Sequence, residues 1–110
     1  GLAMGTKDVF VNLVGGLRVD DPAADLSILC SIASSTMDKP IGENIVLLGE
    51  VGLAGEVRSI NRLEHRLNEA ATLGFKQAIV PKASVNDKAK KVKIELHAAK
   101  FVKDAFRVLF

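Results

Sequence analysis

The chain of 110 residues contains no tryptophan and no tyrosine, so any stacking on nucleobases would depend on its five phenylalanines. Cys30 is the only cysteine, which excludes an internal disulfide and a zinc site built from several cysteines. No apolar run is long enough to cross a bilayer, and residues 1–16 lack the basic start and apolar stretch of a signal peptide. These absences predict an intracellular protein that makes no contact with membranes.

Charge is unevenly distributed along the chain, although the net charge is only +2. Residues 1–81 contain 7 Lys and Arg against 10 Asp and Glu, whereas residues 82–110 contain 8 against 3. A basic end on an acidic body favours a polyanionic partner. A lysine-rich face that is merely solvated is the other interpretation.

The first half of the chain predicts strands, a buried helix and a hairpin. Alternating apolar residues predict a strand over residues 7–14, which a glycine turn pairs with residues 17–19. Residues 20–37 predict a mostly buried helix, and residues 45–51, apolar on both faces, predict one central strand. Two Gly-Glu-Val triplets around a glycine-rich turn predict a hairpin over residues 49–57.

The segment NRLEHRLNEAATLGF, residues 61–75, predicts an amphipathic helix. Asn61 can cap its first turn, with Glu64 completing a capping box, and Gly74 can end it. Its apolar stripe consists of Leu63, Leu67, Ala70 and Leu73.

The last third predicts a strand over residues 76–81, a polar loop with a weak strand over residues 92–96, and a closing helix over residues 97–110. The order of all these elements predicts one domain over residues 1–110. Its fold class is α+β, with a mixed sheet packed with helices.

The start of the first helix, in the segment DDPAADLSILC, carries strong helix-initiating signals and no reactive side chain. Asp21 can cap the helix, and Pro22 fits its first position. Ala23 and Ala24 follow, at the positions where a reactive group would be best exposed. The residues alone do not explain why this start is chemically empty.

Other familiar chemistry is not indicated. Neither glycine-rich segment leads into the lysine and serine or threonine of a phosphate-binding loop. His65 and His97 are far apart in sequence, so a surface role is favoured over metal binding. The serines of the first helix favour close packing over catalysis, because none sits at a strained turn: Ser27, Ser31, Ser34 and Ser35.

Two motifs, DVFVNLVGGLRVDDPAADLSI and GEVGLAGEVRSINRLEHRLNEAATLGFKQAIVPK, carry a family resemblance. In order and spacing they resemble the C-terminal domain of the RadA (Sms) family of bacterial DNA-repair ATPases, which is similar to the proteolytic domain of Lon. The resemblance is close over residues 7–85 and weaker over the last 25 residues. It implies a Lon proteolytic-domain-like fold, also described as ribosomal protein S5 domain 2-like.

The resemblance also gives a reason for the empty helix start. Lon-type peptidases place a catalytic serine in a Gly-Pro-Ser-Ala-Gly segment there, and its position falls on Ala23. Their partner lysine falls on Arg66, which stays protonated and cannot act as a general base. Asp25 stands at a glycine position, where a carboxylate would oppose an oxyanion. The resemblance therefore implies a peptidase fold without peptidase catalysis.

By the same resemblance, the chain is expected to form one tier of a homohexameric ring in a bacterial cytoplasm. That tier would act as a scaffold and contact single-stranded DNA during branch migration, alongside other recombination or replication proteins. ATP, Mg²⁺ and Zn²⁺ are expected only in regions N-terminal to this domain, so no cofactor is expected within this chain.

Two basic groups are candidates for DNA contact. Arg58, Arg62 and Arg66 could form a stripe that grips phosphates, or could instead pair with Glu69 and neighbouring subunits. The second group consists of Lys82, Lys88, Lys90, Lys91 and Lys93. Either group would bind without sequence preference and would be sensitive to salt.

Two other functions stay open at this point. The chain could be an active peptidase with an unrecognised nucleophile, such as Ser27 or Ser31. It could also be a purely protein-binding structural tier that makes no DNA contact.

Overall fold

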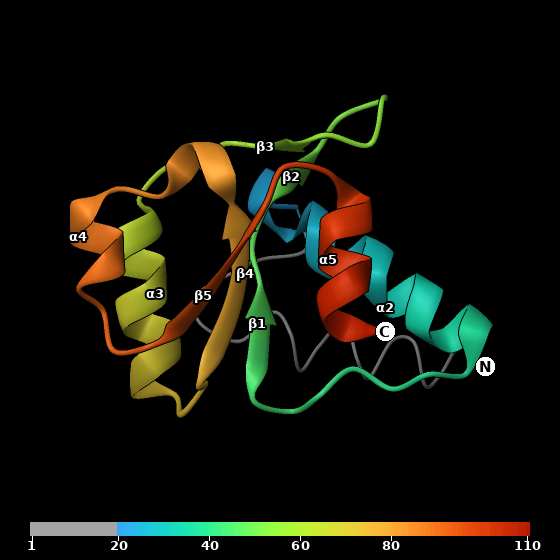
Figure 1. The fold of residues 1–110 in the computed structure, drawn as a ribbon, viewed down its shortest axis with the longest axis horizontal. Coiled ribbons are helices and arrows are strands. Elements are labelled where there is room, and N and C mark those ends of the chain that lie inside the picture. The colour runs from blue at the N-terminus through green and yellow to red at the C-terminus, as the bar shows by residue number, and fades with distance from the viewer. Residues whose placement is uncertain (1–19) are drawn as a thin grey trace.

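A parallel sheet of three strands lies at the centre of the computed structural model, which describes residues 20–110 (Figure 1). In spatial order the strands are β1 (Ile45–Leu47), β4 (Gln77–Pro81) and β5 (Glu95–Ala99). Among the described strands β4 is therefore the middle one, rather than the segment over residues 45–51. The strand predicted over residues 7–14, with its partner at 17–19, lies outside the described residues.

The segment predicted as one strand over residues 45–51 is divided in two. After β1 the chain leaves the sheet, and β2 (Glu50–Val51) pairs antiparallel with β3 (Val57–Arg58). Gly49 permits the close approach of these segments, because a Cβ atom there would lie 2.8 Å from Cγ1 of Val57. The predicted hairpin is confirmed, although the predicted single strand is wrong.

Helix α2 (Asp25–Met37) begins where the sequence predicts, after one 3₁₀ turn, η1 (Pro22–Ala24). Asp21 caps this turn, because its carboxylate accepts a hydrogen bond from the N–H of Ala23 at 2.9 Å. The helix ends at Asp38, which adopts the left-handed conformation with a φ of 54°. A capped 3₁₀ turn therefore leads into α2, and a left-handed residue ends the helix.

Helix α3 (Leu63–Thr72) forms as predicted, but it begins differently. Arg62 stands at the N-cap in the left-handed region, with a φ of 57°, and no side chain caps the first turn. The predicted capping box of Asn61 and Glu64 is wrong. Both oxygens of Asn61 instead accept hydrogen bonds from the guanidinium of Arg66.

The end of α3 is the glycine stop that the sequence predicts. Gly74 has a φ of 97°, and its N–H donates to the carbonyl of Ala71, while the N–H of Phe75 donates to that of Ala70. This paired arrangement reverses the chain toward β4. Leu73, just before the stop, is 58% exposed, so its predicted place in the apolar stripe is wrong.

The basic segment after β4 contains a short helix that the sequence did not predict. A 3₁₀ turn, η2 (Lys82–Ser84), is followed by α4 (Asp87–Lys90). The side chain of Asn86 caps α4 by accepting the N–H of Ala89 at 2.9 Å, and Ala89 is buried. Residues 82–96 are thus more ordered than the predicted polar loop.

The last strand and helix are both shifted along the chain. The weak strand predicted over residues 92–96 is β5, which runs on to Ala99, and α5 (Val102–Leu109) begins after it. Asp104 defines this boundary, because its carboxylate accepts the N–H groups of Lys100 and Phe101 ahead of the helix. The predicted helical start near residue 97 is therefore wrong.

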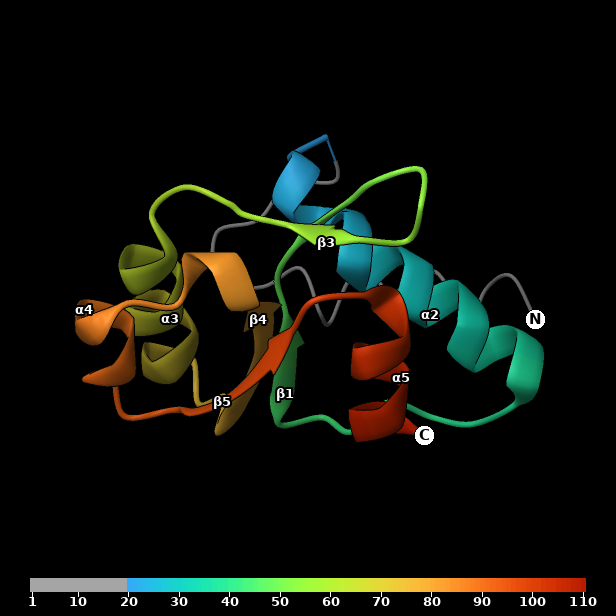
Figure 2. The ribbon, with the colours of Figure 1, turned by 45° about the horizontal axis from the view of Figure 1, so that its top comes forward.

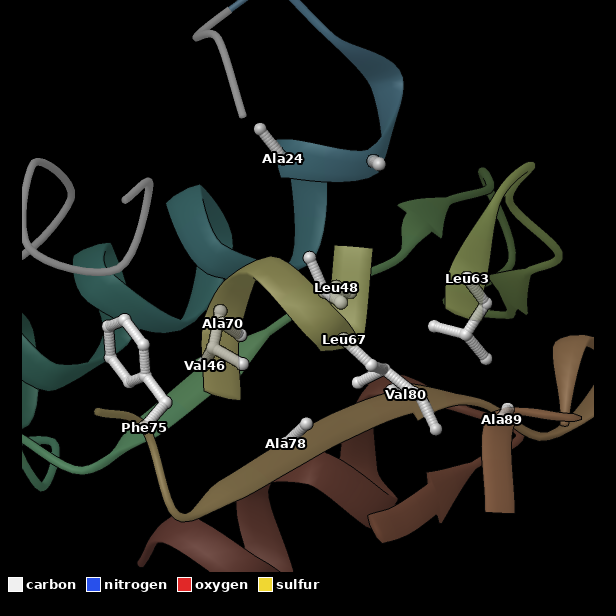
Figure 3. Close-up of a cluster of buried hydrophobic side chains, with 11 residues drawn as sticks. Ala24, Val46, Leu48, Leu63, Leu67, Ala70, Phe75, Ala78, Val80 and Ala89 are labelled. Atoms are coloured by element: carbon white, nitrogen blue, oxygen red, sulfur yellow. The ribbon is translucent and has the colours of Figure 1, made fainter. Parts of the chain in front are cut away.

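Helices cover both faces of the sheet, with α3 and α4 on one side and α2 and α5 on the other (Figures 1 and 2). Successive side chains of a strand point to opposite faces of the sheet, so the hydrophobic core forms two layers, one on each face. On β1, Val46 faces α3 while Leu47 faces α2. Figure 3 shows the first of these two layers, which includes Leu67, Ala70, Ala78, Val80 and Ala89. No helix within residues 20–110 is long and apolar enough to span a membrane.

Replacing Leu67 by alanine is expected to lower the free energy of unfolding by about 2–5 kcal/mol, because its side chain is fully buried against the sheet. Leu73→Ala, on the same helix but exposed, makes the same chemical change and is expected to cost less than about 0.5 kcal/mol. Urea unfolding of both variants measures the difference. Equal losses would contradict the described orientation of α3.

Candidate functional site at the start of helix α2

A polar cleft of about 320 Å³ lies where the start of α2 meets the start of α3. The hairpin and the chain after it form the rest of its wall. Its lining residues are Asp21, Pro22, Ala23, Glu50, Ser59, Ile60, Asn61 and Arg66. The structure therefore brings Ala23 and Arg66, which are far apart in sequence, to one site.

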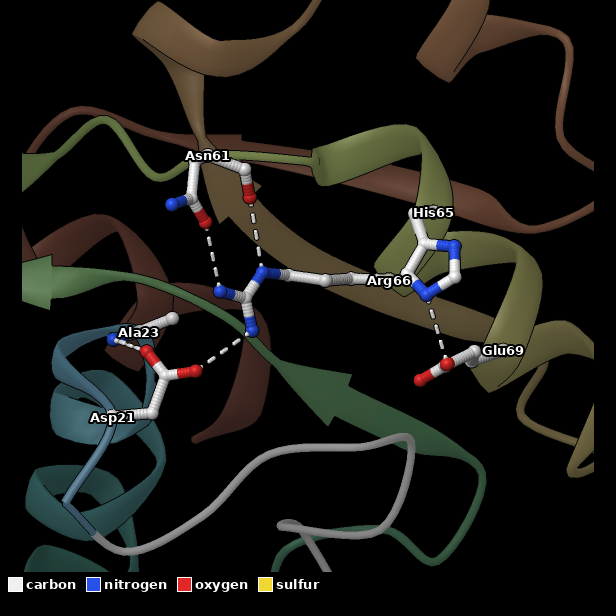
Figure 4. Close-up of polar contacts among 6 residues, drawn as sticks. All are labelled: Asp21, Ala23, Asn61, His65, Arg66 and Glu69. Atoms are coloured by element: carbon white, nitrogen blue, oxygen red, sulfur yellow. Dashed lines mark hydrogen bonds and ion pairs between the residues drawn. The ribbon is translucent and has the colours of Figure 1, made fainter.

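The Arg66 side chain crosses the cleft in a fixed position (Figure 4). Its Nη1 lies 3.1 Å from Oδ2 of Asp21, while Nε and Nη2 each donate to an oxygen of Asn61 at 3.0 Å. The side chain is only 14% exposed. Because all three guanidinium nitrogens are engaged, Arg66 holds the cleft together and is not a free surface cation.

Asp21 is the centre of this arrangement. One carboxylate oxygen accepts the N–H of Ala23 and the other accepts Arg66, so the carboxylate links the start of α2 to α3. Burial raises the pKa of the Asp21 carboxyl, but the hydrogen bonds from Ala23 and Arg66 and the positive charge of Arg66 outweigh burial. The pKa therefore lies below its usual value, and the carboxylate stays charged.

Within residues 20–110, neither Ala23 nor Arg66 brings a nucleophile or a general base to the cleft. Ala23 presents only a methyl group and is 2% exposed. The hydroxyl of Ser59, a lining residue that the sequence did not single out, has no hydrogen-bond partner among residues 20–110. Among the lining residues within 20–110, Arg66 is the one basic side chain, and it cannot accept a proton. Asp25 lies outside the lining and accepts the N–H of Val51 at 3.1 Å.

The predicted arginine stripe does not form one exposed row. Arg66 is turned into the cleft, and Arg62 precedes α3 in the left-handed conformation. Arg58 is exposed and lies 3.5 Å from a carboxylate oxygen of Glu56. Glu69, suggested as an arginine partner, pairs with His65 at 3.0 Å instead.

The lysine group is exposed throughout. None of its members forms an ion pair with any residue of the described range 20–110. The group spans η2, α4 and the approach to β5, and consists of Lys82, Lys88, Lys90, Lys91 and Lys93. Its positive charge is therefore available to a partner.

The remaining nucleophilic and metal-binding candidates lie apart from the cleft. Ser27 and Ser31 are fully buried, and neither hydroxyl has a hydrogen-bond partner within the described part of the chain. Burial raises the pKa of the Cys30 thiol to about 12. His97 contacts Gln77 at 2.9 Å. Within residues 20–110, no group of three His, Cys, Asp or Glu residues could hold a metal ion.

Comparison with known proteins identifies the family. A family model described as "ChlI: Subunit ChlI of Mg-chelatase" matches residues 1–84, and the chain belongs to this family. Three similar curated proteins, from Escherichia coli (strain K12), Halalkalibacterium halodurans and Bacillus subtilis (strain 168), are each named DNA repair protein RadA.

These relatives are 44%, 42% and 43% identical to the chain over 108, 108 and 107 residues, respectively. The matches cover 98%, 98% and 97% of this chain but only 23%, 24% and 23% of the relatives. The resemblance drawn from the two sequence motifs is thus confirmed. The chain spans about a quarter of the length of the curated relatives it matches.

Replacing Asp21 by asparagine is expected to lower the free energy of unfolding by roughly 1–2 kcal/mol at pH 7, because the Arg66 charge then has no carboxylate partner. Since folding lowers the pKa of Asp21, its charge stabilises the fold above the unfolded-state pKa of about 4. That contribution disappears as the pH falls through the folded-state pKa.

Urea unfolding between neutral and acidic pH is therefore expected to show the wild type and Asp21→Asn converging at low pH. Asp87→Asn is the matched control, since the exposed Asp87 carboxylate forms no ion pair within residues 20–110. A gap between wild type and Asp21→Asn that does not change with pH would contradict the charged contact.

Proposed function

We propose that this chain is the noncatalytic, Lon-like scaffold of a RadA-type DNA repair and recombination ATPase in a bacterial cytoplasm. It supports assembly of a ring, proposed to be a homohexamer, and contacts single-stranded DNA during branch migration. The shared name of relatives that match nearly the whole chain supports this proposal. ATP and its metal ion would be bound by other parts of such a protein.

The observation that carries the noncatalytic role is the Asp21–Arg66 contact beside Ala23. A serine–lysine peptidase needs an oxygen nucleophile and an amine that can lose its proton. The cleft has a methyl group at the first place and a guanidinium fixed by three hydrogen bonds at the second. The contact holds the start of α2 against α3, and the lining within residues 20–110 contains no lysine or histidine that could replace the missing amine.

The alternative of a peptidase with another nucleophile has little geometric support. Ser27 and Ser31 are each 0% exposed, and neither lines the cleft. A nucleophile must reach both its substrate and a base within hydrogen-bond distance. In the described fold these two serines reach neither.

The wild-type chain and the Ala23→Ser variant are both expected to leave fluorescent casein intact, because Arg66 stays protonated in each. A serine-reactive fluorophosphonate is likewise expected to label neither protein. Labelling of the wild type that is lost in Ser27→Ala, Ser31→Ala or Ser59→Ala would contradict the proposal and favour the peptidase alternative.

For DNA contact, the geometry favours the lysine group over the arginines. Arg66 is engaged in the cleft and Arg58 lies beside Glu56, whereas the lysines of residues 82–93 have no acidic partner in the described part of the chain. Neutralising phosphates with such lysines releases counterions and gives affinity that falls with salt. The proposed contact is therefore electrostatic and independent of sequence.

Lys88→Ala/Lys90→Ala is expected to weaken binding of a single-stranded oligonucleotide. The slope of log affinity against log salt should decrease by about 0.7 for each lost phosphate contact. Fluorescence anisotropy across a salt series measures both effects. Lys39→Ala/Lys76→Ala removes the same charge from exposed positions outside the group and is the matched control.

Two outcomes would contradict DNA contact by the lysine group. A loss in Arg58→Ala/Arg62→Ala that exceeds the loss in the lysine variant would move the contact to the arginines. If the wild type fails to bind at low salt, the chain is instead a purely protein-binding tier. Measuring its mass in solution, with and without the oligonucleotide, tests ring assembly in the same samples.

A further inference from the structure

An exposed aromatic ring lies between two lysines at the start of α5. Phe101 is 36% exposed, although it is one of the largest apolar side chains of the domain. The Nζ atoms of Lys100 and Lys103 lie 5.9 and 5.5 Å from the centre of its ring. An aromatic face can stack on the base of a nucleotide, and cations beside it can bind the phosphate.

The backbone that presents this ring is fixed on two sides. The carboxylate of Asp104 accepts the N–H groups of Lys100 and Phe101 at 3.0 and 2.9 Å. On the other side, Glu56 of the hairpin forms a β-bridge with Phe101, and the N–H of Val102 donates to the hairpin at 2.9 Å. A backbone held in this way loses little conformational freedom when the ring binds a ligand.

The ring also lies at the end of the sheet that carries other positive charge. Pro81 of β4 is paired with Ala99 of β5, and the next residues are Lys82 and Lys100. Because the strands are parallel, both lysines emerge at the carboxyl edge. In both views η2 follows the end of β4 and the β5–α5 link follows the end of β5, so both lie at this end of the sheet (Figures 1 and 2).

The carboxylates near the ring are already engaged. Asp104 accepts two backbone N–H groups and lies 3.5 Å from Arg107. Glu56 accepts the N–H of Ala54 and lies 3.5 Å from Arg58. Each acid therefore has a local partner, and Lys100 and Lys103 remain available for phosphate.

We propose that Phe101 is a stacking platform for a base of single-stranded DNA, with Lys100 and Lys103 binding the flanking phosphates. The inference rests on the proposed function, since it names a base-binding position within the DNA contact. In the free protein the lysine ammonium groups lie against the ring. A stacking base displaces them, and they move to the phosphates.

The test uses the full chain of residues 1–110 and oligothymidylate. Phe101→Ala is expected to weaken binding about tenfold, because stacking on one aromatic side chain accounts for an effect of that order. Phe101→Trp is expected to bind at least as well as wild type. Since the chain has no other tryptophan, quenching of its fluorescence by the oligonucleotide reports stacking directly.

Three controls make the result specific. An abasic oligonucleotide of the same length should bind wild type and Phe101→Ala equally, because it has phosphates but no bases. Ile32→Ala removes an exposed apolar side chain from α2 and should bind like wild type. Urea midpoints equal to that of the wild type show that each variant is folded. Tighter binding of oligouridylate than of oligothymidylate would overturn the assignment to DNA.

The stacking proposal and the proposed function fail differently. Salt-sensitive binding by the wild type that is unchanged in Phe101→Ala, or a Phe101→Trp emission that oligothymidylate does not quench, overturns only the stacking platform. Absence of binding by the wild type at low salt overturns the DNA contact itself, and the platform with it.

Discussion

The Asp21 carboxylate makes the contact on which the described arrangement depends. One of its oxygens starts α2 through the N–H of Ala23, and the other holds the guanidinium of Arg66. Arg66 in turn takes both oxygens of Asn61, which leaves the first turn of α3 without a side-chain cap. One partly buried ion pair thus holds the start of α2 against the start of α3.

This contact stabilises the fold with side chains that would otherwise be open to a ligand in the cleft. Removing one partner of a partly buried ion pair leaves the other charge without compensation, which destabilises the fold. Asp21 and Arg66 are therefore expected to stay paired. Exposed positive charge lies outside the cleft and includes the basic segment around α4 and the start of α5. This distribution of charge supports the proposed role of the basic surfaces in binding.

The sequence predicted a helix end correctly where residues close to that end in the chain determine it. The start of α2 at Asp21 and the end of α3 at Gly74 need only capping within one turn. The start of α3 and the helix α4 were missed, because they depend on contacts made by folding: the hold of Arg66 on Asn61, and the burial of Ala89. The two motifs placed Ala23 and Arg66 together, but they gave no indication that Asp21 would join them.

The order of the parallel strands also has a consequence during synthesis. Ile45 of β1 pairs with Gln77 of β4, which in turn pairs with Glu95 of β5, so the strands that pair within residues 20–110 of this sheet are distant in sequence. Closing such long loops before any ladder forms is slow compared with helix formation. On the ribosome, β1 would emerge after α2 but well before β4, the strand with which it pairs. Until these strands pair, their unpaired edges are open to aggregation.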